Sequence, residues 1–300
     1  EVSGKAQLAY SGFTGLSGPG GFGTLLLDPY NITISDDTAV NSTGTAATGD
    51  DSVINVTTLT DALAGADVTI TTAAGGSQAG DITVASAISW SADTILTLAA
   101  DNDININADI TATGTNAGLV LNSGGDYVFN NGASATLSGA SASLKIDNIA
   151  YTLIRSMAEI DAIDASASNP SGHYALAYDL DASGTTYHDT LVGGGSNKFS
   201  GTFAGLGHTI TGFTIDLTNP DSSPIYANYG LFGRNFGTIR DIGLVDAHMT
   251  VTGGTYGNFG LLVGWNKGPN AKILNAYTTG EINAAFDHAD SNTPAVGGLA

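Results

Sequence analysis

The amino-acid sequence predicts an all-β protein, a β-solenoid in which short strands of successive turns stack in parallel. Three observations lead to this fold class. A glycine-rich phrase recurs in the C-terminal third, short strand patterns recur every 22 to 24 residues in the first half, and only two segments have helical character. Repeats of this length are typical of supersecondary units that stack and bury a shared core.

The recurrent phrase begins at Gly230, again at Gly260 and a third time at Gly297, which gives spacings of 30 and 37 residues. The first two copies carry glycine and asparagine at matching places: Gly230, Gly233, Asn235 and Gly237, then Gly260, Gly264, Asn266 and Gly268. We predict that the asparagines stack and hydrogen-bond from turn to turn, and that the glycines allow positive φ in the turns. The third copy is cut short, so we expect the chain to be a slice of a longer, processed protein.

Strand patterns in the first half recur with a nearly constant period. Ile82 and Ile104 are 22 residues apart, and Ile95 and Leu119 are 24 apart. Two or three short strands within each period are typical of a parallel β-helix. A β-sandwich also gives short strands separated by turns, but the persistence of the period favours the solenoid.

The two helical segments are short. The first covers 59–66, with Thr60 or Asp61 as its expected N-cap. The second covers 155–167, where Ser156 and a glutamate three residues later fit a capping box. We interpret both as insertions into the solenoid.

These patterns divide the chain into four segments. We expect a glycine-rich start with the first strands in 1–58, solenoid turns in 59–150, a helix and strand–loop insertion in 151–198, and repeat turns in 199–300 that continue beyond the chain end.

Composition narrows the function classes. The formal net charge is −20, from 28 acidic and 8 basic residues. A field of this sign repels nucleic acids and anionic membrane surfaces, so we predict no nucleic-acid partner. The chain has no cysteine, which excludes disulfides and thiolate sites. No apolar run is long enough for a membrane span, so we predict no membrane insertion.

Several phrases resemble a known family. Residues 23–34 resemble the G-x-L-x-L-D-P-x-x-I-T-I phrase of the large exoproteins of the filamentous haemagglutinin family, and 80–108 continue that likeness. Residues 174–185 and 199–210 are similar to the lead-in to GLUG repeats, and the recurrent phrase described above is similar to the GLUG repeats themselves.

The resemblance implies a right-handed parallel β-helix that is exported by two-partner secretion and displayed at a bacterial cell surface. It implies adhesion, with an outer-membrane secretion partner and with glycans or proteins of a host or neighbouring cell as ligands. The chain shows no N-terminal secretion domain of the kind that this family uses. GLUG repeats also occur in a group of immunoglobulin A proteases, so the repeats alone leave a protease elsewhere in the full protein open.

Catalytic motifs are missing from the sequence. None of the five histidines is followed by glutamate, which excludes the H-E-x-x-H zinc motif, and no G-x-S-x-G nucleophile elbow occurs. We therefore expect no catalytic residues, no enzyme activity and no organic cofactor.

One acidic stretch is a weak calcium candidate. Asp101, Asp103 and Asp109 alternate with isoleucines, so that on a strand the carboxylates share one face. Calcium prefers several oxygen ligands, but the spacing does not match an EF-hand. A polar outer face over an apolar core is the interpretation that we favour.

The sequence as a whole predicts a non-catalytic adhesin segment, a rigid stalk in which any binding residues lie on exposed loops and strand faces such as 36–51, 183–197 and 218–228. Five aromatic residues suit stacking on sugar rings or packing in the core: Trp90, Trp265, Tyr187, Tyr226 and Tyr229. Two alternatives remain open at this point. One is a filament-forming matrix or sheath protein whose rods associate head to tail, and the other is a polysaccharide lyase or hydrolase on the same scaffold.

Overall fold

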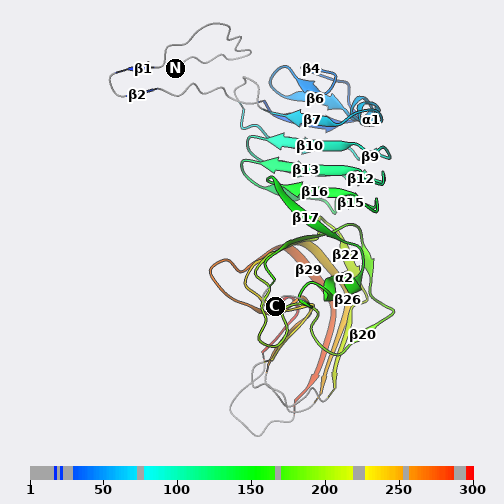
Figure 1. The fold of residues 1–300 in the computed structure, drawn as a ribbon, viewed down its shortest axis with the longest axis vertical. Helices are drawn as coiled ribbons and strands as arrows, with labels where there is room; N and C mark the ends of the chain where they lie inside the picture. The colour runs from blue at the N-terminus through cyan, green and yellow to red at the C-terminus, as the bar shows by residue number, and fades with distance from the viewer. Residues whose placement is uncertain are drawn as a thin grey trace. The chain divides into compact units, whose positions relative to one another are not determined.

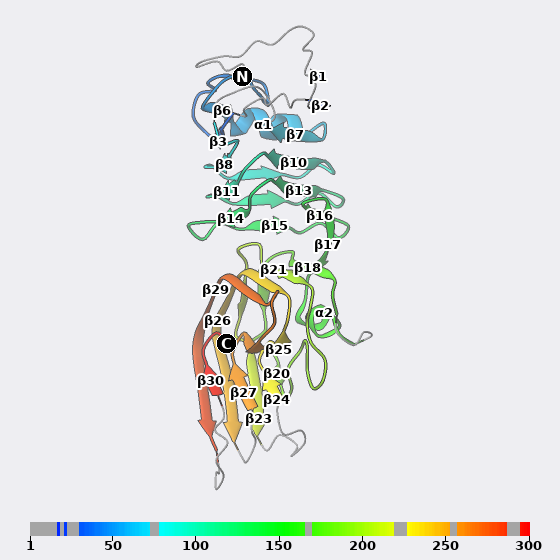
Figure 2. The ribbon, with the colours of Figure 1, turned by 90° about the vertical axis from the view of Figure 1, so that its left-hand side faces the viewer.

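The computed structural model describes residues 17–18, 21–22, 30–72, 78–165, 170–218, 227–252, 257–286 and 295–300. The chain divides into two compact units, Glu1–Ala150 and Tyr151–Ala300. In the described ranges each unit consists mainly of strands and contains one short helix (Figures 1 and 2). The prediction of an all-β protein with two short helices is confirmed.

In the first unit the chain visits three sheets in turn (Figure 1). One sheet holds β6 (Ser52–Asn55), β3 (Ile32–Ser35), β8 (Ile82–Val84), β11 (Ile104–Ile106) and β14 (Tyr127–Phe129). The second holds β9 (Ile88–Trp90), β12 (Ile110–Ala112) and β15 (Ala135–Leu137). The third holds β7 (Val68–Thr71), β10 (Ile95–Ala100), β13 (Gly118–Ser123) and β16 (Ser143–Ile146). From β7 and β8 onward each strand pairs in parallel with the strand of the same sheet one period later. At the start of the unit, β3 pairs in parallel with both β6 and β8.

The register of these strands aligns like residues into buried columns. Ile82 pairs with Ile104, as the period of the sequence predicts, and Ile104 pairs with Tyr127. Ile95 pairs with Gly118, one residue before the predicted Leu119. Because paired strands lie ~4.8 Å apart, the side chains of one column contact each other, and both Ile82 and Ile104 are fully buried.

Aspartates at the corners join one turn to the next. Asp81 Oδ1 accepts a hydrogen bond from the Asp103 amide at 3.1 Å, and Asp103 Oδ1 accepts one from the Asp126 amide at 2.9 Å. Asp93 Oδ1 accepts in the same way from the Asn116 amide at 2.9 Å. Each carboxylate satisfies a backbone N–H of the next turn that has no partner in the strand ladders.

Helix α1 (Val56–Leu63) begins earlier than predicted. Its N-cap is Asn55, whose Oδ1 accepts from the amides of Thr57 at 3.0 Å and Thr58 at 3.4 Å. The prediction of Thr60 or Asp61 as the cap is therefore wrong. Asn55 is both the last residue of strand β6 and the N-cap of α1, because its side chain accepts hydrogen bonds from backbone amides of the first turn that have no partner within the helix.

The predicted loop 36–51 contains two short strands. β4 (Ser42–Thr43) and β5 (Ala46–Ala47) form an antiparallel hairpin. Two further strands, β1 (Ser17–Gly18) and β2 (Gly21–Phe22), pair antiparallel near the start of the chain.

In the second unit the strands are again parallel but of unequal length. β17 (Ile149–Ile154) pairs with β18 (His173–Leu176) through its last three residues. β21 (Thr202–Ala204), β22 (Thr209–Thr211) and β23 (Thr214–Thr218) all pair with successive parts of β26 (Thr238–Thr252). β26 in turn pairs with β29 (Lys272–Ala285), and these two long strands lie side by side in Figure 2. The three short strands β21, β22 and β23 of one turn therefore correspond to the single long strand β26 in the next turn.

The remaining strands of this unit form smaller parallel pairings. They are β19 (Leu180–Asp181) with β22, β20 (Thr186–Tyr187) with β23, β24 (Ala227–Tyr229) with β27 (Gly257–Gly260) and β30 (Ala295–Gly297), and β25 (Phe232–Asn235) with β28 (Val263–Asn266).

Phenylalanines fill the core of the second unit. Phe232 lies between Phe199 and Phe203, with ring centroids 5.3 and 5.2 Å away, and all three side chains are fully buried. Such aromatic contacts add to the stabilisation from buried area.

Helix α2 (Met157–Asp161) starts as predicted and ends early. Ser156 Oγ accepts from the Glu159 amide at 3.2 Å, and Glu159 Oε2 accepts from the Arg155 amide at 2.6 Å. This is a capping box whose second bond reaches the residue before the N-cap. No helix among the described residues is long and apolar enough to cross a membrane.

Candidate functional site

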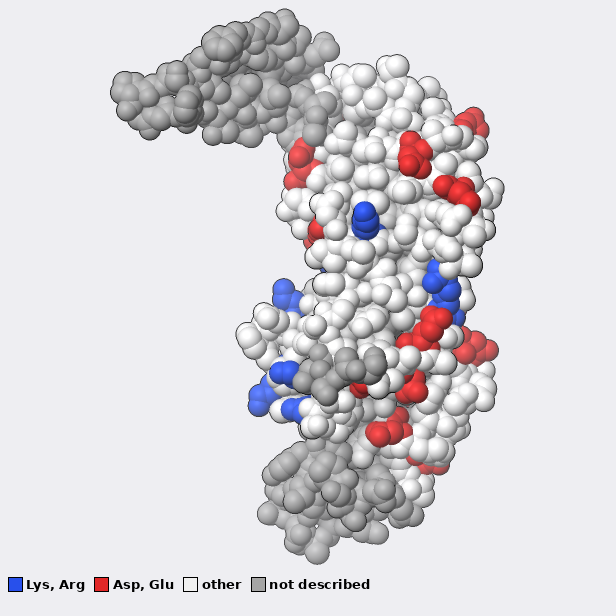
Figure 3. Space-filling model, in the orientation of Figure 1, with Lys and Arg blue, Asp and Glu red and all other residues white. Residues whose placement is uncertain are grey.

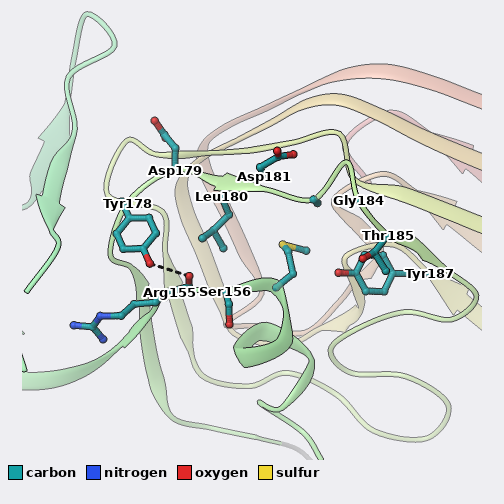
Figure 4. A pocket seen from close by; sticks show the side chains of 11 residues that line it. Arg155, Ser156, Tyr178, Asp179, Leu180, Asp181, Gly184, Thr185 and Tyr187 are labelled. Carbon is teal, nitrogen blue, oxygen red and sulfur yellow. Dashed lines mark hydrogen bonds between the residues drawn. The ribbon is translucent and has the colours of Figure 1, made fainter. Parts of the chain in front are cut away.

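The second unit contains a cavity of about 310 Å³ where the start of α2 faces the chain around β19. Figure 4 shows the residues that line it. They are Arg155, Ser156, Met157, Tyr178, Asp179, Leu180, Asp181, Ala182, Gly184, Thr185 and Tyr187. We call this cavity the tyrosine pocket.

Two tyrosines stand on opposite sides of the pocket, with Leu180 between them (Figure 4). The Tyr178 hydroxyl donates to the backbone oxygen of Arg155 at 3.1 Å, which holds that ring against the start of α2. The Arg155 guanidinium points away from the pocket in Figure 4. One wall is therefore fixed by a hydrogen bond from Tyr178 to the residue before the N-cap of α2.

The other wall is fixed by packing. The Tyr187 ring lies 5.5 Å from the Phe213 ring, centroid to centroid, at an interplanar angle of 32°. Partial burial, and then the negative charge of Asp161, raise the pKa of the Tyr187 hydroxyl. Tyr187 therefore stays a neutral phenol at physiological pH, able to donate and accept hydrogen bonds.

Two carboxylates border the pocket, and both also hold turns in place. Asp179 Oδ1 accepts from the Thr209 amide at 2.7 Å and lies 3.3 Å from Nδ1 of the buried His208. Asp181 Oδ1 accepts from the Ser183 amide at 2.9 Å. The Ser183 side chain, and then its amide, lower the pKa of the Asp181 carboxyl. Asp181 is therefore an ionised acceptor at neutral pH and lacks the raised pKa of a general acid.

Together these groups suit a small polar ligand with apolar faces. Aromatic walls contact the ring carbons of a sugar, and carboxylate, hydroxyl and backbone groups bind its hydroxyls. The loop 183–197, which the sequence predicts to bear binding residues, contributes Gly184, Thr185 and Tyr187 to the lining. The loop 218–228 lies almost entirely outside the described residues.

Sequence reasoning singled out Tyr187 but not Tyr178 or Arg155. The sequence contains a signal that could have pointed to Tyr178. It lies in the segment 174–185, where apolar and polar residues alternate from Tyr178 until Gly184, as expected of a strand followed by a turn. Its partner lies 23 residues earlier, at Arg155, and no local pattern connects the two.

The three calcium candidates each hold a different neighbour. Asp101 Oδ2 accepts from the Thr72 hydroxyl at 3.1 Å, Asp103 Oδ1 from the Asp126 amide at 2.9 Å, and Asp109 Oδ1 from the Ser134 amide at 2.9 Å. The isoleucines between them are buried, as the alternation predicts. In the described part of the chain, no three His, Cys, Asp or Glu side chains gather as a metal site would require.

The repeated asparagines are stacked. Asn235 Nδ2 donates to Asn266 Oδ1 at 2.7 Å, and Asn235 Oδ1 accepts from the Gly237 amide at 3.0 Å. Asn235 is fully buried, whereas Asn266 is exposed.

The repeated glycines serve a different purpose from the one predicted. Only one of the six glycines at the repeat positions, Gly268, has a positive φ, of 124°. The others lie against the backbone of a neighbouring segment: a side chain at Gly230 would meet the Gly260 carbonyl, and one at Gly237 would meet the Gly201 carbonyl. Close approach of stacked backbones therefore requires glycine at these places.

The other aromatic candidates lie apart from the tyrosine pocket. Trp90 is in the core of the first unit, where its Nε1 donates to the Thr94 oxygen at 3.1 Å. Tyr229 stacks on Phe259 with centroids 5.6 Å apart. Trp265 is half-buried and lies among basic side chains. Tyr226 lies outside the described residues.

Comparison with known proteins gives one informative likeness. Over 141 residues, 43% of this chain, the sequence is 32% identical to halomucin of Haloquadratum walsbyi, and the match spans 1% of halomucin's length. No family model matches the chain. No solved structure matches it.

Proposed function

We propose that the chain is a non-catalytic segment of a large secreted surface protein, an adhesin in which a rigid β-helical scaffold presents binding sites on its loops. The observation that carries the proposal is the tyrosine pocket, because it is built on the segment around β19 and β20, whose strands pair in parallel with β22 and β23. Loops fixed by a stiff scaffold are where recognition residues concentrate.

The proposal includes the winding of the chain. Parallel strands joined by a crossover within a sheet are right-handed in about 98% of cases. We therefore propose that the successive turns of both units form right-handed parallel β-helices, as the resemblance to filamentous haemagglutinins implies.

The likeness to halomucin supports a place outside the cell. The matched stretch is a minute part of that protein, which agrees with a chain that is one segment of a much longer one. Export by two-partner secretion, with an outer-membrane partner, stays a prediction from the family resemblance.

For the pocket we propose a neutral sugar as ligand. On a glycan array, the wild-type chain is expected to bind a subset of neutral oligosaccharides, and Tyr187→Ala is expected to lose that binding. Tyr277→Ala is the matched control, because Tyr277 is 52% exposed and lies outside the pocket. Equal binding by the Tyr187 and Tyr277 variants, or no sugar bound by the wild type, would count against the proposal.

The absence of catalysis needs its own measurement. Incubation with the bound oligosaccharide is expected to leave it intact, with no new reducing ends and no unsaturated products. Steady turnover that Asp181→Asn abolishes would instead support the lyase or hydrolase alternative.

A second candidate function, association of rods head to tail, is favoured by one observation. Among the described strands, β29 has a partner on one side only, and it exposes Leu274 and Tyr277. A long strand edge with apolar side chains is a template for pairing. Electron microscopy at rising protein concentration is expected to show filaments in this case, and monodisperse particles at every concentration would exclude it.

A further inference from the structure

Basic side chains gather on one flank of the second unit, visible as blue atoms in Figure 3. The chain has only eight lysines and arginines. Three of them, Lys198, Arg234 and Lys267, lie against the rings of Phe236 and Trp265. We call these five residues the basic–aromatic patch.

The stacking of turns creates this patch. Phe199 pairs with Asn235, and Arg234 pairs with Trp265, so Lys198, Arg234 and Trp265 follow one another in three successive turns. Phe236 and Lys267 each stand two residues beyond a member of that column. Both lie just beyond the ends of β25 and β28, and the contacts of Phe236 with Lys198 and of Lys267 with Trp265 place them on the same surface.

The contacts alternate cations and rings. Arg234 lies beside both aromatic rings, with its guanidinium carbon 5.7 Å from the Phe236 centroid and 5.1 Å from the Trp265 centroid. Lys198 Nζ lies 4.9 Å from the Phe236 centroid, and Lys267 Nζ lies 4.7 Å from that of Trp265. The two rings meet edge to face at 6.1 Å. Cation–π contacts of this kind hold the charges in place at the surface.

The positive charges of Arg234 and Lys267 are available for a partner. Among the described residues, no carboxylate forms a salt bridge with Arg234 or Lys267. Arg234 donates from Nη1 to the Ser196 oxygen at 3.1 Å, a neutral acceptor that orients the guanidinium without cancelling its charge. In a chain of net charge −20, such a group of cations is an exception that packing alone does not require.

A cavity adjoins the patch at Trp265. It has a volume of about 260 Å³ and is lined by Asn258, Phe259, Gly264, Trp265, Asn266, Ala295, Val296, Gly297 and Ala300. Trp265 therefore belongs both to the cationic surface and to an apolar recess beside it.

We propose that the basic–aromatic patch binds an acidic polysaccharide, with Arg234 and Lys267 pairing to carboxylates and the recess at Trp265 receiving a pyranose ring. Arginine binds carboxylates with charge-assisted hydrogen bonds, and aromatic rings contact the carbons of a sugar. Nucleic acid is disfavoured, because its dense phosphate charge meets the negative field of the whole chain. An acidic sugar chain meets the same field at lower charge density, and salt screens that field beyond about 8 Å, so its binding depends on the local cations of the patch.

The experiment is calorimetric titration of the full chain with oligogalacturonate and, separately, with its methyl ester, which keeps the sugar backbone and removes the charge. We expect binding of the acid and not of the ester. Arg234→Gln and Lys267→Gln are each expected to weaken it about tenfold, the loss of one charge-assisted contact. Lys145→Gln is the matched control, because Lys145 is an exposed lysine in the first unit.

Four outcomes would overturn the proposal: no binding of the acid, equal binding of the ester, an equal loss in the Lys145 variant, or equal binding of polyglutamate or single-stranded DNA. The proposal would also be overturned if the wild-type chain self-associated and Lys267→Gln abolished that association. The patch would then bind the acidic surface of a second copy of the chain. Lys267 is exposed, so its variant tests the site even if Arg234→Gln fails to fold. The tyrosine pocket shares no residue with the patch, and failure here leaves the neutral-sugar proposal standing.

Discussion

Asn235 Nδ2 donates to Asn266 Oδ1 at 2.7 Å, joining residues 31 positions apart that occupy the same place in successive turns. The same Nδ2 also lies 3.2 Å from the Gly237 oxygen and 3.3 Å from the Lys272 oxygen. One buried amide therefore links its own turn to the next, which makes it a sensitive point for testing how the turns are held together.

Replacement of Asn235 by alanine is expected to lower the free energy of unfolding by about 2 kcal/mol, because buried backbone groups lose their partner. Asn266→Ala is the control: Asn266 is exposed, so water replaces its lost bond and the change should be smaller. Guanidinium unfolding followed by fluorescence measures both. If the two variants were equally stable, the asparagine pair would have no special role.

Acid is expected to loosen the corners of the first unit. The backbone amide of Asn116, and then its side chain, lower the pKa of the Asp93 carboxyl from the usual 3.8. Because the folded pKa is depressed, the stabilisation is present above the unfolded pKa and is lost as pH falls through the folded one. Asp93→Asn should therefore be less stable than wild type at pH 7 and equally stable at the acid end. Melting curves from pH 7 downward check this, with Asp61→Asn, an exposed helix residue, as the control.

Salt is expected to stabilise the whole chain. With a net charge of −20, like charges repel each other in the folded state, and ions screen that repulsion. We expect the melting temperature to rise by about 5 °C between dilute buffer and molar sodium chloride. A melting temperature that stays flat or falls would show that attractive pairs dominate instead.

Replacement of Gly280 by alanine is expected to destabilise the second unit by roughly 3 kcal/mol. Gly280 has a φ of 134°, and a β-carbon there would overlap the Ala247 carbonyl oxygen. Such a backbone conformation is nearly confined to glycine. Gly65→Ala is the control, since a β-carbon at Gly65 meets no neighbour. Equal denaturation midpoints for the two variants would contradict the argument.

Calcium is expected to leave the melting temperature unchanged at millimolar concentration. Asp101, Asp103 and Asp109 already accept hydrogen bonds from neighbouring turns, so an ion would have to displace those donors. If calcium raised the melting temperature of the wild type but not that of Asp103→Asn, the acidic face would be a calcium site after all.

Much of the scaffold could be predicted because it repeats. The period between Ile82 and Ile104 matches their observed pairing, and Ser156 caps α2 as its local pattern indicates. The repeat period, the alternation of apolar and polar residues, and helix capping are local or recurrent properties. They can therefore be recognised in the sequence without knowing which turns are neighbours.

The ligand surfaces required the tertiary structure. Tyr178 contacts Arg155, and Lys198 lies beside Arg234 and Phe236. Both contacts depend on the register in which successive turns of unequal length pair. The sequence by itself determined an all-β chain of stacked turns with an acidic exterior. The tertiary structure decided which side chains of distant turns share a face, because register depends on how each intervening loop closes and no local pattern encodes that closure.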